Sequence, residues 1–311
     1  MFIVKNRKVF YGISIGLVVI SIVALLVWGL IPGIDFKGGS AMEVTYTGAR
    51  PEMSVVKAEI DALNFTPSLK DTYQVRPIGD DSYVVKLRSI TETERGELER
   101  VLTTGAVKAE VKKFNSIGPV LGQEAARKSM MSVVLVLLAI VLFITFVFRK
   151  VSEPVSSWKY GLFSIIALSH DVIIPSGVFA ILGHYLGYEV DTLFVTAMLV
   201  VLGFSIHDTI VVFDRVRENL GINNQKPSKD KKEFDVVVGE SINQTFVRSV
   251  STSFATLLAV VALYFFGPAA TKNFALVLII GIFFGTYSSI FIASNLLVTN
   301  YKMMMNKENK K

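Results

Sequence analysis

Residues 203–219 read GFSIHDTIVVFDRVREN, and the rest of the chain is arranged around this stretch. An apolar run that begins at Leu193 ends here in a charged segment. Asp208 lies in the apolar part, where a carboxylate at membrane depth costs at least ~2.5–3.5 kcal/mol. If this apolar run is a membrane-spanning helix, Asp214 and Arg215 mark the point where it leaves the lipid. A carboxylate as deep as Asp208 therefore needs a partner or has a function.

The composition is that of a membrane protein. Of 311 residues 51% are apolar and 19% charged, and the mean hydropathy is +0.51. The absence of cysteine excludes a disulfide framework and a thiolate metal site. His170, His184 and His207 fit no metal-ligand spacing, so we expect no metal and no cofactor. The net charge of +6 comes from basic residues beside apolar runs, which favours membrane orientation over nucleic-acid binding.

Six apolar runs are each near the length that crosses ~30 Å of hydrocarbon at about 1.5 Å per residue. They cover residues 9–31, 133–148, 161–182, 193–213, 246–266 and 274–298. The first is longer than the core of a cleaved signal peptide, so we expect it to stay in the protein. The expected fold is a multi-pass α-helical membrane protein with six transmembrane helices. Its expected segments are 1–34, an outer domain at 35–127, spans in 128–213, a loop at 214–245, spans in 246–298 and a tail at 299–311.

The distribution of Lys and Arg predicts the orientation. With six spans both termini share one side, and nearly all basic residues of the short loops fall on that side. They are Lys5, Arg7, Lys8, Arg149, Lys150, Lys159, Arg215, Arg217, Lys226, Lys229, Lys231, Lys232, Lys302, Lys307, Lys310 and Lys311. The opposite short loops contain Lys272 alone. Both termini are therefore expected in the cytoplasm, and residues 35–127 outside.

The outer segment has the pattern of a small α+β domain. Alternation predicts strands at 42–46, 73–78, 83–88 and 109–115, and helices at 52–63 and 91–103. Thr91 and Glu94 form a capping-box pattern at the start of the second helix. The order strand-helix-strand-strand-helix-strand predicts a ferredoxin-like extracytoplasmic domain between the first two spans. No catalytic triad or phosphate loop is visible in it, so it is either a folded spacer or a docking surface.

Ionisable residues interrupt three of the apolar runs. His170 and Asp171 lie near the middle of the third, and Pro175 removes the N–H that would bond the Asp171 carbonyl. A polar point at this depth is tolerated only against protein or water. The fourth run contributes Ser205, His207 and Asp208, and the fifth contributes Arg248 at a similar distance from the cytoplasmic end.

Two stripes of small or hydroxyl residues accompany these groups. In the fifth run the stripe is Ser241, Thr245, Arg248, Ser249, Thr252, Ser253 and Thr256, whose spacings of three and four put them on one helical face. This face is either a packing surface or a hydrophilic path. In the sixth run Gly281 and Gly285 form a GxxxG pattern, followed by Ser288, Ser289 and Asn295. That stripe favours close helix packing.

Asp208 and Arg248 allow two interpretations. In the first, the two residues form a static ion pair near the interface, or their side chains extend to water. Alternatively Asp208 is a site that takes up and releases a proton. Asp171 and Asp208 share one obligate cation, Arg248, so one acid has no compensating charge among the membrane residues of this chain. His170 and His207 either assist or fill hydrogen-bonding positions.

Four blocks of sequence resemble the SecF branch of the SecD/SecF protein-export family. They are GIDFKGG at 33–39, GFSIHDTIVVFDRVREN at 203–219, SINQTFVRSVSTS at 241–253 and IGIFFGTYSSIFIAS at 280–294. They occur in the family's order and span almost the whole chain. Gly38, Gly39 and Gly285 belong to these blocks. The family often has Asn where this chain has His207.

The resemblance implies a function and a set of partners. In this family, part of the resistance-nodulation-division superfamily, the residues matching Asp208 and Arg248 take part in proton conduction. Asp171, His170, His207, Ser205 and Thr252 would be further members of a relay or polar network. The implied partners are SecD, the SecYEG channel with its accessory membrane subunits, the unfolded polypeptide pushed by SecA, protons and membrane lipids. The implied location is the bacterial cytoplasmic membrane.

The expected function is therefore auxiliary and not enzymatic. The chain would use the proton motive force, together with SecD, to promote protein export, and its outer domain would face the substrate. One alternative is a small-molecule or lipid exporter of the same superfamily, although such exporters carry two six-helix halves. A second alternative is a scaffold of the translocon that conducts no protons.

Overall fold

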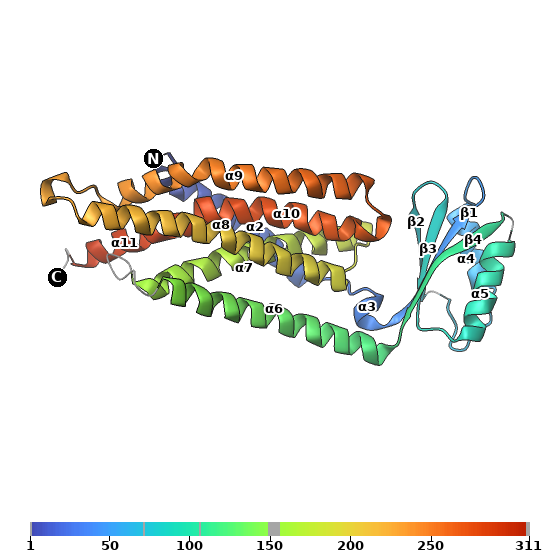
Figure 1. The fold of residues 1–311 in the computed structure, drawn as a ribbon. Helices are drawn as coiled ribbons and strands as arrows, with labels where there is room; N and C mark the ends of the chain where they lie inside the picture. Colours follow the sequence, from blue (N-terminus) through green and yellow to red (C-terminus); the bar gives the residue numbers. More distant parts are fainter. Residues whose placement is uncertain (1, 71, 106, 149–155, 309–311) are drawn as a thin grey trace. The chain divides into compact units, whose positions relative to one another are not determined.

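The computed structural model describes residues 2–70, 72–105, 107–148 and 156–308 (Figure 1). Arg149, Lys150, Lys310 and Lys311, which contribute to the predicted orientation, lie outside the described residues. The chain divides into two compact units. A helical unit comprises Met1–Ile31 and Met131–Lys311, and a sheet unit comprises Pro32–Met130.

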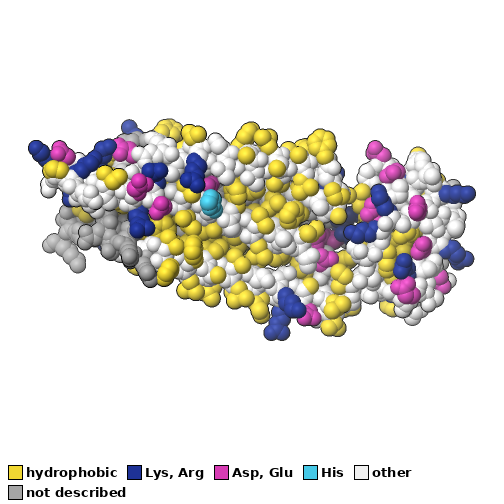
Figure 2. Space-filling model, in the orientation of Figure 1, with side chains coloured by type: hydrophobic (Ala, Val, Ile, Leu, Met, Phe, Trp, Pro, Cys, Tyr) yellow, Lys and Arg dark blue, Asp and Glu magenta, His cyan; other side chains and the backbone are white. Residues whose placement is uncertain are grey.

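Among the described residues, six helical segments are long and apolar enough to cross a membrane, as the sequence predicts. They are α2 (Arg7–Val27), α6 (Pro119–Val147), α7 (Ser157–Leu186), α8 (Thr192–Asn224), α9 (Phe234–Phe266), and a last segment made of α10 (Lys272–Ser288), the π-helix η3 (Ser289–Ala293) and α11 (Ser294–Glu308). Short elements complete the helical unit: α1 (Phe2–Lys5), η1 (Ser228–Asp230) and η2 (Ala269–Thr271). In Figure 2 hydrophobic side chains cover the middle of the helical unit, as lipid contact requires.

The segment 214–245 is mostly helical, which differs from the predicted loop. Helix α8 continues to Asn224 and α9 begins at Phe234, so the connection is short. Charged side chains pair along the exposed face of α8, with Arg215 bound to Glu218 at 2.9 Å. The buried face continues through Val216 and Leu220 into the core. Because charge on one face does not interrupt an apolar stripe on the other, the helix extends beyond the predicted membrane boundary.

Helix α1 and the end of α11 lie at the same end of the helical unit as the connection between α8 and α9 (Figure 1). Lys302 of α11 binds Asp235 of α9 at 2.5 Å. The Tyr301 ring packs on Phe234 with centroids 4.5 Å apart. This end therefore collects α1, the start of α9 and the end of α11.

Helix α10 approaches α8 closely at two glycines. A Cβ added at Gly285 would lie 3.0 Å from the Ser205 Cβ, and one at Gly281 would overlap the Val201 side chain. The predicted GxxxG pattern is therefore a packing surface. It brings the backbone of α10 within reach of the polar residues of α8.

The sheet unit has the predicted element order. Its elements are α3 (Ile34–Lys37), β1 (Gly39–Tyr46), α4 (Met53–Asp61), β2 (Gln74–Ile78), β3 (Ser82–Leu87), α5 (Glu92–Thr104) and β4 (Ala109–Ile117). The antiparallel sheet has the strand order β2-β3-β1-β4. Its core joins the sheet residues Met42, Val44 and Val85 to helix residues such as Ile60 and Leu98. Thr91 caps α5 with the predicted capping box to Glu94.

Gly38 and Gly39 are required by the backbone where α3 meets β1. Their φ angles are 78° and 138°, which side chains rarely adopt. A Cβ at Gly38 would lie 2.7 Å from the Pro119 Cα, and one at Gly39 would lie 2.7 Å from the Leu87 carbonyl oxygen. The GIDFKGG block is therefore a tight junction within the sheet unit.

Candidate functional site

Asp171 is the centre of a hydrogen-bond network inside the helical unit. Its side chain is fully buried. Oδ2 accepts hydrogen bonds from Ser205 Oγ of α8 at 2.5 Å and from Ser288 Oγ of α10 at 2.7 Å. Oδ1 lies 2.9 Å from His170 Nδ1. Hydrogen bonds to a charged group contribute about 1.5–3 kcal/mol each, so this carboxyl ties three helices together.

The π-helix η3 continues the network on the side of α8. Ser289 Oγ donates to the Ser205 carbonyl at 3.1 Å and lies 2.8 Å from Thr209 Oγ1. Ser294 Oγ donates to the Ser289 carbonyl at 3.0 Å. Successive residues of a helix point about 100° apart, so the two adjacent serines reach different partners: Ser288 bonds Asp171, and Ser289 bonds α8. Such π-bulges occur often at functional sites.

Asp208 lies one turn further along α8, beside α9. Its side chain is 3% exposed. Ser249 and Ser253 of α9 are close enough to act on it. However, Asp208 Oδ2 and Ser249 Oγ are both buried without a hydrogen-bond partner among the residues that the structure describes. A buried carboxylate oxygen without a partner is costly, so this site is incomplete within the helical unit.

Arg248 does not pair directly with Asp208. Its side chain is exposed, no ion pair joins the two within the described ranges, and it acts on Asp208 at longer range. The reason is the helical angle of about 100° between successive residues. Since Ser249 faces α8, the neighbouring Arg248 points away from it. His207 is likewise exposed on α8, next to the buried Asp208.

The polar stripe predicted on α9 divides into two. Ser241, Thr245, Ser249 and Ser253 are buried and face the bundle. Arg248 and Thr252 are exposed on the adjacent face, where Thr252 Oγ1 donates to the Arg248 carbonyl at 2.9 Å. The buried half of the stripe is therefore a packing surface, which is one of the two alternatives that the sequence left open. The other half, with Arg248 and Thr252, is an exposed polar face next to it.

The structure brings Asp171, His170 and Ser205 together. Arg248, His207 and Thr252 are exposed and are not brought into that network. Sequence reasoning assigned Ser288 and Ser289 to helix packing and did not connect them to Asp171. The signal for Ser288 was its spacing, since Gly281, Gly285 and Ser288 follow one another at intervals of four and three and share one face of α10. Tyr287, which stacks on His170 with centroids 6.1 Å apart, was not identified.

Three comparisons relate this chain to known proteins. Residues 97–303 match the family model described as protein export membrane protein SecD/SecF, C-terminal. A protein translocase subunit SecF of Thermobaculum terrenum is 39% identical over 305 residues, covering 96% of this chain and 93% of the relative. The SecF of Anaerolinea thermophila is 35% identical, with 95% and 92% covered.

Longer proteins contain a similar region. The Thermus thermophilus SecDF subunit is 36% identical over 269 residues, which is 85% of this chain and 34% of the relative. A crystal structure of SecDF from that organism, titled a translocon-associated membrane protein, superposes with a TM-score of 0.81 at 31% identity. It covers 95% of this chain and 38% of the SecDF chain. The chain thus spans nearly the whole of SecF relatives and about a third of SecDF.

Proposed function

Because the chain belongs to the SecD/SecF family of protein-export membrane proteins, we propose that it is the SecF subunit of the Sec translocase. In this role it acts with a SecD protein to promote the movement of polypeptides across the cytoplasmic membrane, using the proton motive force. It is a transport subunit and not a bond-making enzyme. The SecDF relatives, in which one chain includes a region similar to this one, support SecD as the partner.

The observation that carries this proposal is the incomplete site at Asp208. A buried carboxylate oxygen and a buried hydroxyl lack partners there, and His207 and Arg248 are exposed beside them. Ionisable residues in membrane spans face protein or water, which is consistent with another chain covering this face. A membrane helix of SecD is the proposed cover. Asp208 would then exchange a proton as that helix moves, with Arg248 compensating its charge.

The remaining expectations form part of the same proposal. Both termini and the α8–α9 connection would lie in the cytoplasm, since basic residues concentrate there. The sheet unit, with its ferredoxin-like topology, would lie outside and contact the emerging polypeptide. The SecYEG channel would be the neighbour that delivers it. The chain has no cysteine, so single cysteines can test this orientation.

We predict that a cysteine placed at exposed Ser68 reacts with an impermeant thiol reagent added from outside intact cells. A cysteine at exposed Ser228 should react only after the membrane is opened. Labelling is read as a mass shift of the purified chain. Outside labelling of Ser228 would contradict the orientation and leave the family assignment intact.

The test of proton coupling is Asp208→Asn. Asn keeps the size and hydrogen bonding but exchanges no proton, so gradient-dependent export should be lost while insertion and abundance stay normal. The assay uses vesicles that contain this chain, a SecD partner and the channel. Asp214→Asn on the exposed part of α8 is the matched control and should behave as wild type. Wild-type gradient dependence in the Asp208→Asn vesicles would refute proton coupling at this site and favour the scaffold.

A further inference from the structure

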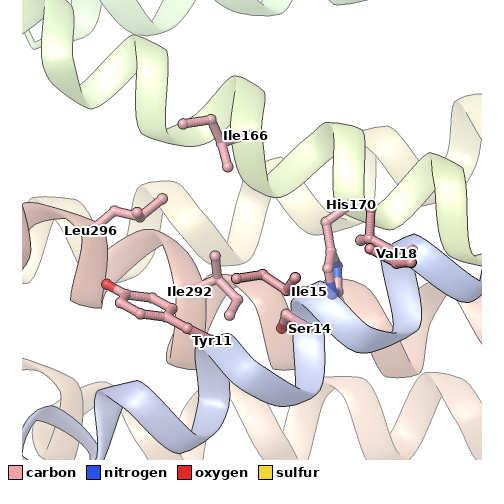
Figure 3. Close-up of a pocket in the computed structure, with 9 residues that line it drawn as sticks. Tyr11, Ser14, Ile15, Val18, Ile166, His170, Ile292 and Leu296 are labelled. Atoms are coloured by element: carbon pink, nitrogen blue, oxygen red, sulfur yellow. The ribbon is translucent and has the colours of Figure 1, made fainter.

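An apolar groove between α2, α7 and the last helical segment contains one unsatisfied polar atom. The groove has a volume of about 400 Å³, and its lining includes Tyr11, Ser14, Ile166, His170, Ile292 and Leu296. Figure 3 shows the His170 imidazole pointing from α7 toward Ser14 on α2. His170 is 5% exposed, and its Nε2 has no hydrogen-bond partner among the described residues. An orphaned ring nitrogen in this position indicates a site for a proton or a water.

The hydrogen bond of the other ring nitrogen, Nδ1, determines whether Nε2 carries a hydrogen. Nδ1 lies 2.9 Å from Asp171 Oδ1. An ionised carboxylate only accepts hydrogen bonds, so His170 donates from Nδ1 whenever Asp171 is charged. A neutral imidazole then has a bare lone pair on Nε2, which faces the groove. The His170–Asp171 pair can therefore accept one proton at Nε2.

Hydroxyl groups lead from this nitrogen toward the end of α2 that begins at Arg7. The Tyr287 ring stacks on His170, and its hydroxyl lies 3.5 Å from Ser14 Oγ. Tyr287 Oη also donates to the Phe10 carbonyl at 3.0 Å. One turn nearer the end of α2, Tyr11 Oη lies 2.9 Å from Thr299 Oγ1. Polar atoms therefore occur at each turn between His170 and the end of the bundle that carries both termini.

We propose that His170 and Asp171 form a second proton-binding site, separate from Asp208 and reached along this line of hydroxyls. Its protonation state sets how tightly α7 holds α8 and α10. Its role in export rests on the proposed function, whereas its titration does not. The site contacts α8 at Ser205, which precedes Asp208 by three residues and so lies about one helical turn from it.

The proton transfer balances within the pair. A proton from a hydronium ion binds to Nε2 and leaves a water molecule, and Nδ1 releases its own proton to Asp171 Oδ1. The imidazole ends neutral with its hydrogen on Nε2, and Asp171 ends as a neutral acid. The pair has gained one positive charge, and only N–H and O–H bonds have changed. The reverse steps release the proton.

Neutralising Asp171 weakens its contacts with the neighbouring helices. Ser205 and Ser288 both donate to Oδ2, and hydrogen bonds to a charged acceptor are about twice as strong as those to a neutral one. The titratable groups around the pair are few: Tyr11 from α2, Tyr287 from α10 and, one turn away on α8, Asp208. Proton uptake would therefore loosen α8 at Ser205, close to Asp208.

The first experiment measures titration directly by infrared difference spectroscopy of the full chain in lipid nanodiscs, from acid to alkaline pH. Protonation of a buried carboxyl gives its own C=O band. That band should persist in Asp208→Asn, disappear in Asp171→Asn and shift in Ser288→Ala, which removes one donor. A spectrum of Asp171→Asn identical to wild type would overturn the proposal. If Asp171→Asn does not fold, an unshifted band in both Ser288→Ala and His170→Gln would do the same.

The second experiment measures export with and without a proton gradient. Asp171→Asn should reduce gradient-dependent stimulation by about tenfold or more, the scale of a lost proton-transfer group. Tyr287→Phe should give a smaller loss. Ser164→Ala and Tyr160→Phe are matched controls, because Ser164 donates to the Tyr160 carbonyl within α7 and the Tyr160 hydroxyl has no partner among the described residues. Full stimulation in Asp171→Asn beside a loss in Asp208→Asn would refute this inference alone; full stimulation in both would refute the proposed function as well.

Discussion

Asp171 and Asp208 are carboxylates in the same helical unit, and they differ in what surrounds them. Asp171 is 0% exposed and has partners from three helices of its own chain. Asp208 is 3% exposed, yet one of its oxygens has no partner among the described residues. Burial alone therefore does not distinguish the two sites. The difference lies in their partners: both Asp171 oxygens have partners within this chain, whereas Asp208 Oδ2 has none among the described residues.

The largest expected difference is between the removal of Asp171 and the removal of Asp208. Asp171→Ala leaves Ser205, Ser288 and His170 without their acceptor, and should lower the free energy of unfolding by about 3 kcal/mol. Asp208→Ala removes a carboxylate that is already unsatisfied, and should change the free energy by less than about 1 kcal/mol. Unfolding of the isolated chain in mixed micelles measures both. Equal losses would contradict the comparison.

Two buried serines, one beside each carboxylate, test the same difference between the Asp171 and Asp208 sites. Ser205 donates to Asp171, whereas Ser249 Oγ is buried without a partner among described residues. Ser205→Ala should therefore cost about 2 kcal/mol in the same unfolding measurement. Ser249→Ala should change the free energy by less than about 0.5 kcal/mol, because the hydroxyl makes no bond to lose. A large cost for Ser249→Ala would mean that the Asp208 site is satisfied within the chain.

A carboxylate of the sheet unit, Glu94, provides a reference for Asp171 and Asp208. Its expected effect on stability is the smallest of the three comparisons. Arg88 binds Glu94 at 2.5 Å in the sheet unit and lowers the Glu94 pKa to about 2. A lowered folded-state pKa means that the stabilisation is present above the unfolded pKa of about 4.3 and is lost as the pH falls toward 2. The pair is partly exposed, so we expect about 1 kcal/mol.

Hydrogen exchange of α5 in the full chain, corrected for intrinsic rates, measures this effect. Glu94→Gln keeps the capping geometry and should remove the difference between pH values above and below that range. Glu92→Gln is the control, since the Glu92 side chain is 84% exposed and its partner Arg95 is one turn away. An unchanged pH dependence in Glu94→Gln would assign the effect to another group.

Local features could be read from the sequence because they depend on few residues. The six spans follow from the length and polarity of each run, and the capping box of Thr91 and Glu94 from spacing along one turn. The element order of the sheet unit follows from alternation between turn signals. Asp208, Asp171 and Arg248 could be identified because a charge in an apolar run is expensive wherever the helix packs.

Tertiary structure alone decided which of these charges are satisfied. Residues 248 and 249 differ by about 100° around α9, so packing against α8 had to select Ser249 for the interior and Arg248 for the exterior. Ser288 follows Gly281 and Gly285 at regular helical spacing, but only the packing of α10 against α7 brought its hydroxyl to Asp171. Helix α8 continued to Asn224 because its buried stripe found a core to pack against. A one-dimensional pattern shows which groups need partners, but the partners come from other helices, whose rotation only packing determines.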